Sequence, residues 1–130
     1  MSDKLQEIIA QVRIDIEQKG QFYPVAEKAI RSDAPRAKDF AQAINQPNKL
    51  SIIAEIKRKS PSAGDLKMGL IPSVLATEYA EAGASALSVL TNESYFGGKM
   101  EDLRSIYDAV NIPLLCKDFI INRRQIFDAR

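Results

Sequence analysis

The stretch that decides the fold is SIIAEIK at residues 51–57, which is short, rich in isoleucine and typical of a β-strand. Two more strand-like stretches follow along the chain, ALSVL at 86–90 and LLCK at 114–117. Helical patterns at 71–82 and 100–110 separate them, and the strand-to-strand repeat is about 30 residues, the length of one βα unit. Strands that alternate with helices in this way predict a parallel sheet with right-handed crossovers.

Three helical segments are predicted before the first strand. The first covers residues 2–19, where apolar residues recur at helical spacing, and it ends at Gly20. Shorter helices are expected over 24–32 and 36–44. After the third strand, Asn122 is placed to cap a last helix.

The length of the chain limits how much of a barrel it can form. It has 130 residues, whereas a closed (β/α)₈ barrel needs about 250. We therefore expect an α/β fold, namely the N-terminal part of a (β/α)₈ TIM barrel with about three βα units, truncated at Arg130. Residues 1–48 would form an N-terminal helical extension and residues 49–130 the βα units. A complete small α/β sandwich is the competing interpretation.

The composition argues against several classes of site and partner. Lys and Arg total 18 against 17 acidic residues, so the net charge of +1 creates no global field for nucleic acid or an anionic membrane. With no histidine and a single cysteine, Cys116, the commonest metal ligands are scarce, and we expect neither a metal nor a cofactor. Without a run of about 18 apolar residues or a signal-peptide core, the expected location is the cytoplasm.

Alternation along the strands places their charged residues on one face, while the opposite, apolar faces are expected to pack under helices. Glu55 and Lys57 share a face of the first strand. Lys57, Leu90 and Lys117 each lie at the carboxyl end of a strand, where barrel active sites form. Lysines gathered in a partly dry pocket can act as general acid, base or phosphate anchor, and a glutamate can orient them. A buried ion pair that only fixes register is the alternative for Glu55 and Lys57.

The loop after the first strand, KRKSPSAG at 57–64, adds hydroxyl groups and positive charge beside this strand end. Ser60 and Pro61 are expected to form a rigid turn that presents a hydroxyl to a ligand. Arg58 and Lys59 are interpreted as solvated loop charges.

Aromatic residues follow the second and third strands. Tyr95 and Phe96 precede a glycine pair, and Phe119 comes shortly after the third strand. Rings above a barrel mouth can bind a flat apolar ligand, and simple loop packing is the alternative. Asp118 is expected to cap or bond the loop backbone rather than to react.

Three blocks of sequence closely resemble a known family. IAEIKRKSPSAG at 53–64, EAGASALSVLTNESYFGG at 81–98 and PLLCKDFIIN at 113–122 are similar, in order and spacing, to indole-3-glycerol phosphate synthase, a (β/α)₈ lyase of tryptophan biosynthesis. The predicted helices before the first strand also look like the family's extra N-terminal helices. Lys99 departs from the small polar helix cap that is usual in the family, which predicts a weaker start of the following helix.

The resemblance implies roles for individual residues. Lys117 matches the general acid that protonates the substrate carbonyl, Lys57 matches the lysine that binds anionic substrate groups and assists proton transfer, and Glu55 matches the glutamate that holds this lysine. The other matches are substrate-binding residues, with Ser60 and Pro61 beside the substrate and Leu90, Phe96 and Phe119 around its anthranilate ring.

The resemblance also implies the reaction. The family closes the indole ring of 1-(2-carboxyphenylamino)-1-deoxyribulose 5-phosphate, a small phosphorylated substrate, with loss of carbon dioxide and water. The family's remaining catalytic groups and main phosphate-binding loops belong to a half that we expect to be absent, so the chain alone is expected to be inactive. The alternative is a non-catalytic half-barrel that self-associates or pairs with its missing half. A phosphoribosylanthranilate isomerase is a less supported third interpretation, because it would not need the Glu55, Lys57 and Lys117 set.

Overall fold

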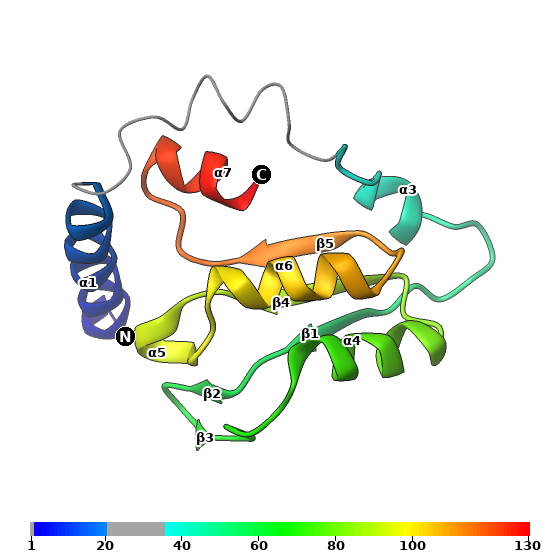
Figure 1. Ribbon diagram of the computed structural model, residues 1–130, viewed down its shortest axis with the longest axis horizontal. Helices are drawn as coiled ribbons and strands as arrows, with labels where there is room; N and C mark the ends of the chain where they lie inside the picture. The colour runs from blue at the N-terminus through cyan, green and yellow to red at the C-terminus, as the bar shows by residue number, and fades with distance from the viewer. Residues whose placement is uncertain (1, 21–35) are drawn as a thin grey trace. The chain divides into compact units, whose positions relative to one another are not determined.

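The computed structural model describes residues 2–20 and 36–130, so the helix predicted over 24–32 lies outside the described residues. The chain divides into two compact units, one of residues 37–118 and one that combines the described part of 1–36 with 119–130. The elements, labelled in Figure 1, are α1 (Ser2–Gly20), α3 (Phe40–Ile44), β1 (Ile53–Ile56), β2 (Lys59–Ser60), β3 (Gly64–Asp65), α4 (Pro72–Glu81), β4 (Ala86–Leu90), α5 (Glu93–Phe96), α6 (Met100–Ala109), β5 (Leu114–Lys117) and α7 (Arg123–Ala129).

The larger unit is built on a three-stranded parallel sheet, as predicted, with strand order β1-β4-β5. Glu55 of β1 is in register with Ser88 of β4, which is in register with Leu115 of β5. Figure 1 shows the three strands running side by side with α4 and α6 packed next to each other across the sheet. The unit is therefore α/β, with strands and helices in the order of the first βα units of a TIM barrel.

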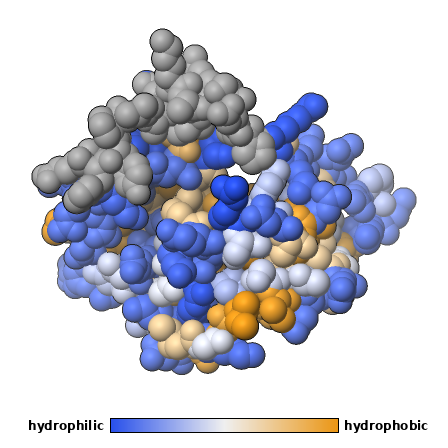
Figure 2. All heavy atoms as spheres, in the orientation of Figure 1, coloured by the Kyte–Doolittle hydropathy of each residue, from blue (hydrophilic) through white to orange (hydrophobic). Residues whose placement is uncertain are grey.

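The core lies between the sheet and these two helices. Leu87 and Val89 point from the central strand to the helices and are completely buried, together with Ala76 of α4 and Ile106 of α6. Ile56 of β1 joins the same cluster, which confirms the predicted apolar strand faces. Apolar side chains also reach the surface among polar ones on the face shown in Figure 2.

The helix predicted over 36–44 is shorter in the structure. It begins only at Phe40, because the Asp39 carboxylate accepts a hydrogen bond from the Gln42 N–H at 2.8 Å and caps the first turn. The prediction was wrong for residues 36–39, which have no helical structure. The long loop predicted after the first strand also contains a small antiparallel pairing of β2 with β3.

A short helix, α5, lies in what was predicted to be the loop after the second strand. The Asn92 side chain caps its start by accepting from the Tyr95 N–H at 3.0 Å, and Gly97 ends it with a φ of 66°, a left-handed conformation that suits glycine. A Cβ atom on Gly98 would lie 1.9 Å from the Leu90 carbonyl oxygen. The glycine pair therefore lets the chain turn back closely against the end of β4.

The smaller unit contains the first and last helices. α1 matches the predicted helix and buries Ile8 and Val12. Asn122 caps α7 as predicted, by accepting a hydrogen bond from the Arg124 N–H at 2.8 Å. Within the described residues, no helix has the length and apolar character needed to cross a membrane.

Candidate active site

The predicted charged face of the sheet carries a small cluster of bonded polar groups. The Lys57 ammonium lies 3.0 Å from one oxygen of the Glu55 carboxylate, and the Ser88 hydroxyl donates to the other oxygen at 3.1 Å. Both charged side chains are about one-third exposed, whereas Ser88 is buried. The glutamate thus holds a lysine at the carboxyl end of β1 while a hydroxyl on the neighbouring strand fixes the carboxylate.

The carboxyl ends of the three strands form one edge of the sheet. Leu90 is in register with Lys117, and Lys57 directly follows the last residue of β1. Leu90 is buried at 6% exposure, whereas the side chains of Lys57 and Lys117 remain accessible. Two lysines and a glutamate are therefore presented along this edge, as the strand alternation predicted.

The loop after β1 forms the expected turn. The Ser60 hydroxyl accepts a hydrogen bond from the Ala63 N–H at 3.1 Å, and Pro61 at the turn is exposed. Lys59 donates to the Ser94 carbonyl oxygen of α5 at 3.0 Å. The loop after β1 is thus tied to the loop after β4.

Arg58 is not a solvated charge, so that prediction was wrong. Its guanidinium forms a two-bonded ion pair with Asp102 of α6, with Nη2 donating to Oδ1 at 3.0 Å, and it also donates to the Gly97 carbonyl oxygen at 3.1 Å. The hydrogen bond to Asp102 raises the pKa of Arg58, although burial opposes this. The Asp102 carboxylate also accepts from the Lys99 N–H at 3.2 Å, so it supplies the helix cap that the Lys99 side chain does not.

A second set of bonds joins the loop after β4 to the end of β5. Asp118 accepts from the Thr91 hydroxyl at 2.8 Å and from the Asn92 side-chain amide at 3.3 Å. Thr91 also lies 3.4 Å from the Cys116 sulfur, and burial raises the pKa of that thiol, which fits a structural role. Asp118 was predicted to cap or bond the loop backbone, whereas in these two bonds its partners are side chains of the loop after β4.

The two candidate aromatic residues belong to different units. Phe96 lies at the end of α5 and is partly buried within the larger unit. Phe119 begins the chain segment assigned to the other unit, where its carbonyl oxygen accepts from the Gln125 side chain at 2.9 Å. The shared role of Phe96 and Phe119 around the anthranilate ring of a substrate therefore stays a prediction.

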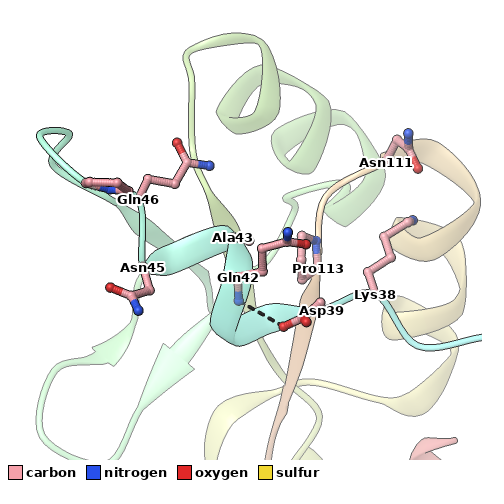
Figure 3. A pocket seen from close by; sticks show the side chains of 9 residues that line it. Lys38, Asp39, Gln42, Ala43, Asn45, Gln46, Asn111 and Pro113 are labelled. Atoms are coloured by element: carbon pink, nitrogen blue, oxygen red, sulfur yellow. Dashed lines mark hydrogen bonds between the residues drawn. The ribbon is translucent and has the colours of Figure 1, made fainter.

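A hollow of about 570 Å³ lies at the other end of the strands, away from Lys57 and Lys117. Figure 3 shows that it is bordered by α3, the following loop and the approach to β5, including Gln42 and Pro113. None of the predicted site residues lines it. Among the described residues, no group of three or more Cys, Asp or Glu side chains is arranged to hold a metal ion.

The sequence of this chain matches the family described as indole-3-glycerol phosphate synthase over residues 5–130. The chain belongs to this family. It is 55% identical over 91 residues to an indole-3-glycerol phosphate synthase of Oceanobacillus iheyensis, covering 70% of this chain and 35% of that protein. It is 40% identical over 126 residues to the one of Listeria welshimeri and 43% identical over 131 residues to the one of Paenarthrobacter aurescens, each time covering 97% of this chain and 48% of the relative.

The chain spans about half the length, or less, of these curated relatives. Its fold is that of the N-terminal βα units of the TIM barrel on which indole-3-glycerol phosphate synthases are built. Sequence reasoning missed the roles of Arg58, Asp102 and Ser88 around the strand edge. Asp102 was detectable because an acidic residue three positions after the residue that precedes a helix is a capping signal. Ser88 was detectable because strand alternation places it on the same face as Leu90.

Proposed function

We propose that this chain supplies the first part of an indole-3-glycerol phosphate synthase active site. The observation that carries the proposal is the Glu55–Lys57–Ser88 cluster at the same sheet edge as Lys117, in a chain of this family. The reaction closes the indole ring of 1-(2-carboxyphenylamino)-1-deoxyribulose 5-phosphate and releases carbon dioxide and water. It is a carbon–carbon lyase reaction of tryptophan biosynthesis, and a cytoplasmic location stays a prediction.

The family resemblance supplies the proposed roles, and the charge and position of the residues support them. Lys117, accessible at the end of β5, donates a proton to the substrate carbonyl oxygen as the ring carbon attacks. Lys57 binds an anionic substrate group and assists proton transfer, and Glu55 holds its ammonium in place. After ring closure, loss of the carboxyl group as carbon dioxide restores the aromatic benzene ring. The new hydroxyl then leaves as water with a hydrogen of the neighbouring carbon, which forms the double bond of the indole.

The substrate-binding assignments complete this proposal. Ser60 and Pro61 would lie beside the substrate on the turn after β1, and Leu90, Phe96 and Phe119 would contact the anthranilate ring. We also propose that residues 1–48 are a helical extension of the barrel and that residues 49–130 are its first three βα units.

The aromatic contacts can be tested in a completed chain, in which residues 1–130 are followed by the carboxyl-terminal half of the Oceanobacillus iheyensis relative. Phe96→Ala and Phe119→Ala are each expected to raise KM about 5- to 150-fold, because about 1–3 kcal/mol of apolar contact is lost. Steady-state kinetics by indole fluorescence measures this. Phe127→Ala, in α7, is the matched control for the loss of a ring. If KM stayed unchanged in both site variants, their rings would only pack the loops.

The alternative of a non-catalytic half-barrel is favoured by the edges of the sheet. Within the described residues, β1 and β5 are the outer strands, and Ile53 and Leu115 on their charged faces are 45% and 40% exposed. Strand edges and exposed apolar residues favour association. The 130-residue chain, made by itself, is expected to be a dimer or larger, or poorly folded, and to show no detectable synthase activity.

Sedimentation equilibrium and the same fluorescence assay test this expectation. Addition of the carboxyl-terminal half of the relative as a separate polypeptide is expected to restore some activity, because a closed barrel leaves no strand edges. Addition of an unrelated α/β protein is the control. A compact, active monomer of 14.4 kDa would contradict the expectation.

A further inference from the structure

Asp118 connects two neighbouring strand ends through its side chain. One of its carboxylate oxygens accepts from the Thr91 hydroxyl and the other from the Asn92 amide. The Thr91 N–H also donates to the Lys117 carbonyl oxygen at 3.2 Å. Backbone and side-chain bonds from the loop after β4 therefore hold the chain on both sides of the peptide bond between Lys117 and Asp118.

Asn92 extends this connection to α5. Its side-chain oxygen caps the helix at the Tyr95 N–H, while its amide nitrogen donates to Asp118. At the other end of α5, Arg58 donates to the Gly97 carbonyl oxygen. The helix that carries Phe96 is thus held by the loop after β1 on one side and by Asp118 on the other.

A carboxylate suits position 118 because Thr91 and Asn92 both donate hydrogen bonds to it. Thr91 and Asn92 are each only 5% exposed, so loss of their acceptor would leave buried donors without compensation by water. Fixing the backbone at Asp118 also fixes the direction in which the preceding Cα–Cβ bond points. The consequence is a defined starting direction for the Lys117 side chain at the end of β5.

We propose that Asp118 is a positioning residue, which acts through Thr91 and Asn92 to orient Lys117 and α5 relative to each other. The proposal rests on the proposed function for its effect on catalysis, because Lys117 is the general acid assigned there. Asp118 itself is not expected to touch the substrate.

The test compares Thr91→Val, which removes the hydroxyl but keeps the shape, with Thr91→Ser, which keeps the hydroxyl. Thr77→Val is the matched control, since Thr77 donates at 2.9 Å to the Ser73 carbonyl oxygen within its own helix, α4. Asp118→Asn, which keeps one acceptor oxygen, is a second probe of the same bonds. Hydrogen exchange, kcat and KM are all measured in the completed chain.

Thr91→Val is expected to speed amide exchange about tenfold in 91–98 and 117–118, as for one lost hydrogen bond, and to leave α4 unchanged. In the completed chain it is expected to lower kcat on the order of 10- to 100-fold with a smaller change in KM, because Lys117 is displaced. Thr91→Ser should restore both values. Asp118→Asn is expected to give the same changes to a smaller extent.

Three results would overturn the proposal. One is equal behaviour of Thr91→Val and Thr77→Val, and another is loss of protection throughout the sheet in Thr91→Val, which would mean a role in general stability. The third is rapid exchange of β4 in the unsubstituted completed chain, which would remove the structural basis. If the unsubstituted completed chain were inactive, the proposed function would fail, while the exchange measurements would still decide whether Asp118 orders these loops.

Discussion

Replacement of Lys117 by alanine in the completed chain is expected to lower kcat by about 10²- to 10⁴-fold while KM changes much less. The reason is that a general acid stabilises the transition state by proton transfer, whereas its contribution to ground-state binding is small. The accessible position of Lys117 at the end of β5, next to the Leu90 position, allows it to meet a substrate carbonyl there. Steady-state kinetics of the variant measures the change.

Lys57→Ala provides the comparison, because this lysine is assigned both a binding and a proton-transfer role. It is expected to raise KM and lower kcat together, and to leave Glu55 without its 3.0 Å partner. Lys67→Ala, an exposed lysine in the loop before α4, is the control for removal of a positive charge. Near-normal turnover of Lys117→Ala would reject the general-acid assignment.

The parts of the fold that the sequence predicted best are the short strands with clear boundaries. The predicted bounds of β4 and β5 agree with the structure, since turn signals flank each strand and apolar residues alternate or run continuously between them. Alternation also predicted that Glu55 and Lys57 share a face, which their 3.0 Å ion pair confirms, because the side-chain period of a strand is fixed by its backbone. Residue roles and substrate identity came only from family resemblance.

The missed features depend on contacts between residues distant in sequence. Arg58 and Asp102 are 44 positions apart, and no local pattern indicates that a loop arginine will meet a helix cap after folding. The helix α5 was missed because four residues are too few for a helical period to be recognised. Asn92 and Gly97 are typical of the start and the end of a helix, but the same residue types are also common in turns.

Loss of the Arg58–Asp102 ion pair is expected to have a large effect on the stability of the fold. The side chains are only 14% and 6% exposed, so Asp102→Ala leaves the guanidinium buried without its main partner. We expect the free energy of unfolding of the completed chain to fall by about 3–5 kcal/mol, as is usual when one partner of a buried ion pair is removed. Urea unfolding followed by circular dichroism measures this.

The same helix offers a matched control in Asp108, whose pair with Arg104 spans 3.6 Å and is mostly exposed. Asp108→Ala is expected to change stability by less than about 1 kcal/mol, because solvent screens an exposed pair. The double variant of Arg58→Ala with Asp102→Ala should lose less than the sum of the single variants, since each single change leaves the other charge unpaired. Additive losses would instead mean that the two side chains stabilise the loops independently, through Gly97 and through the cap at Lys99.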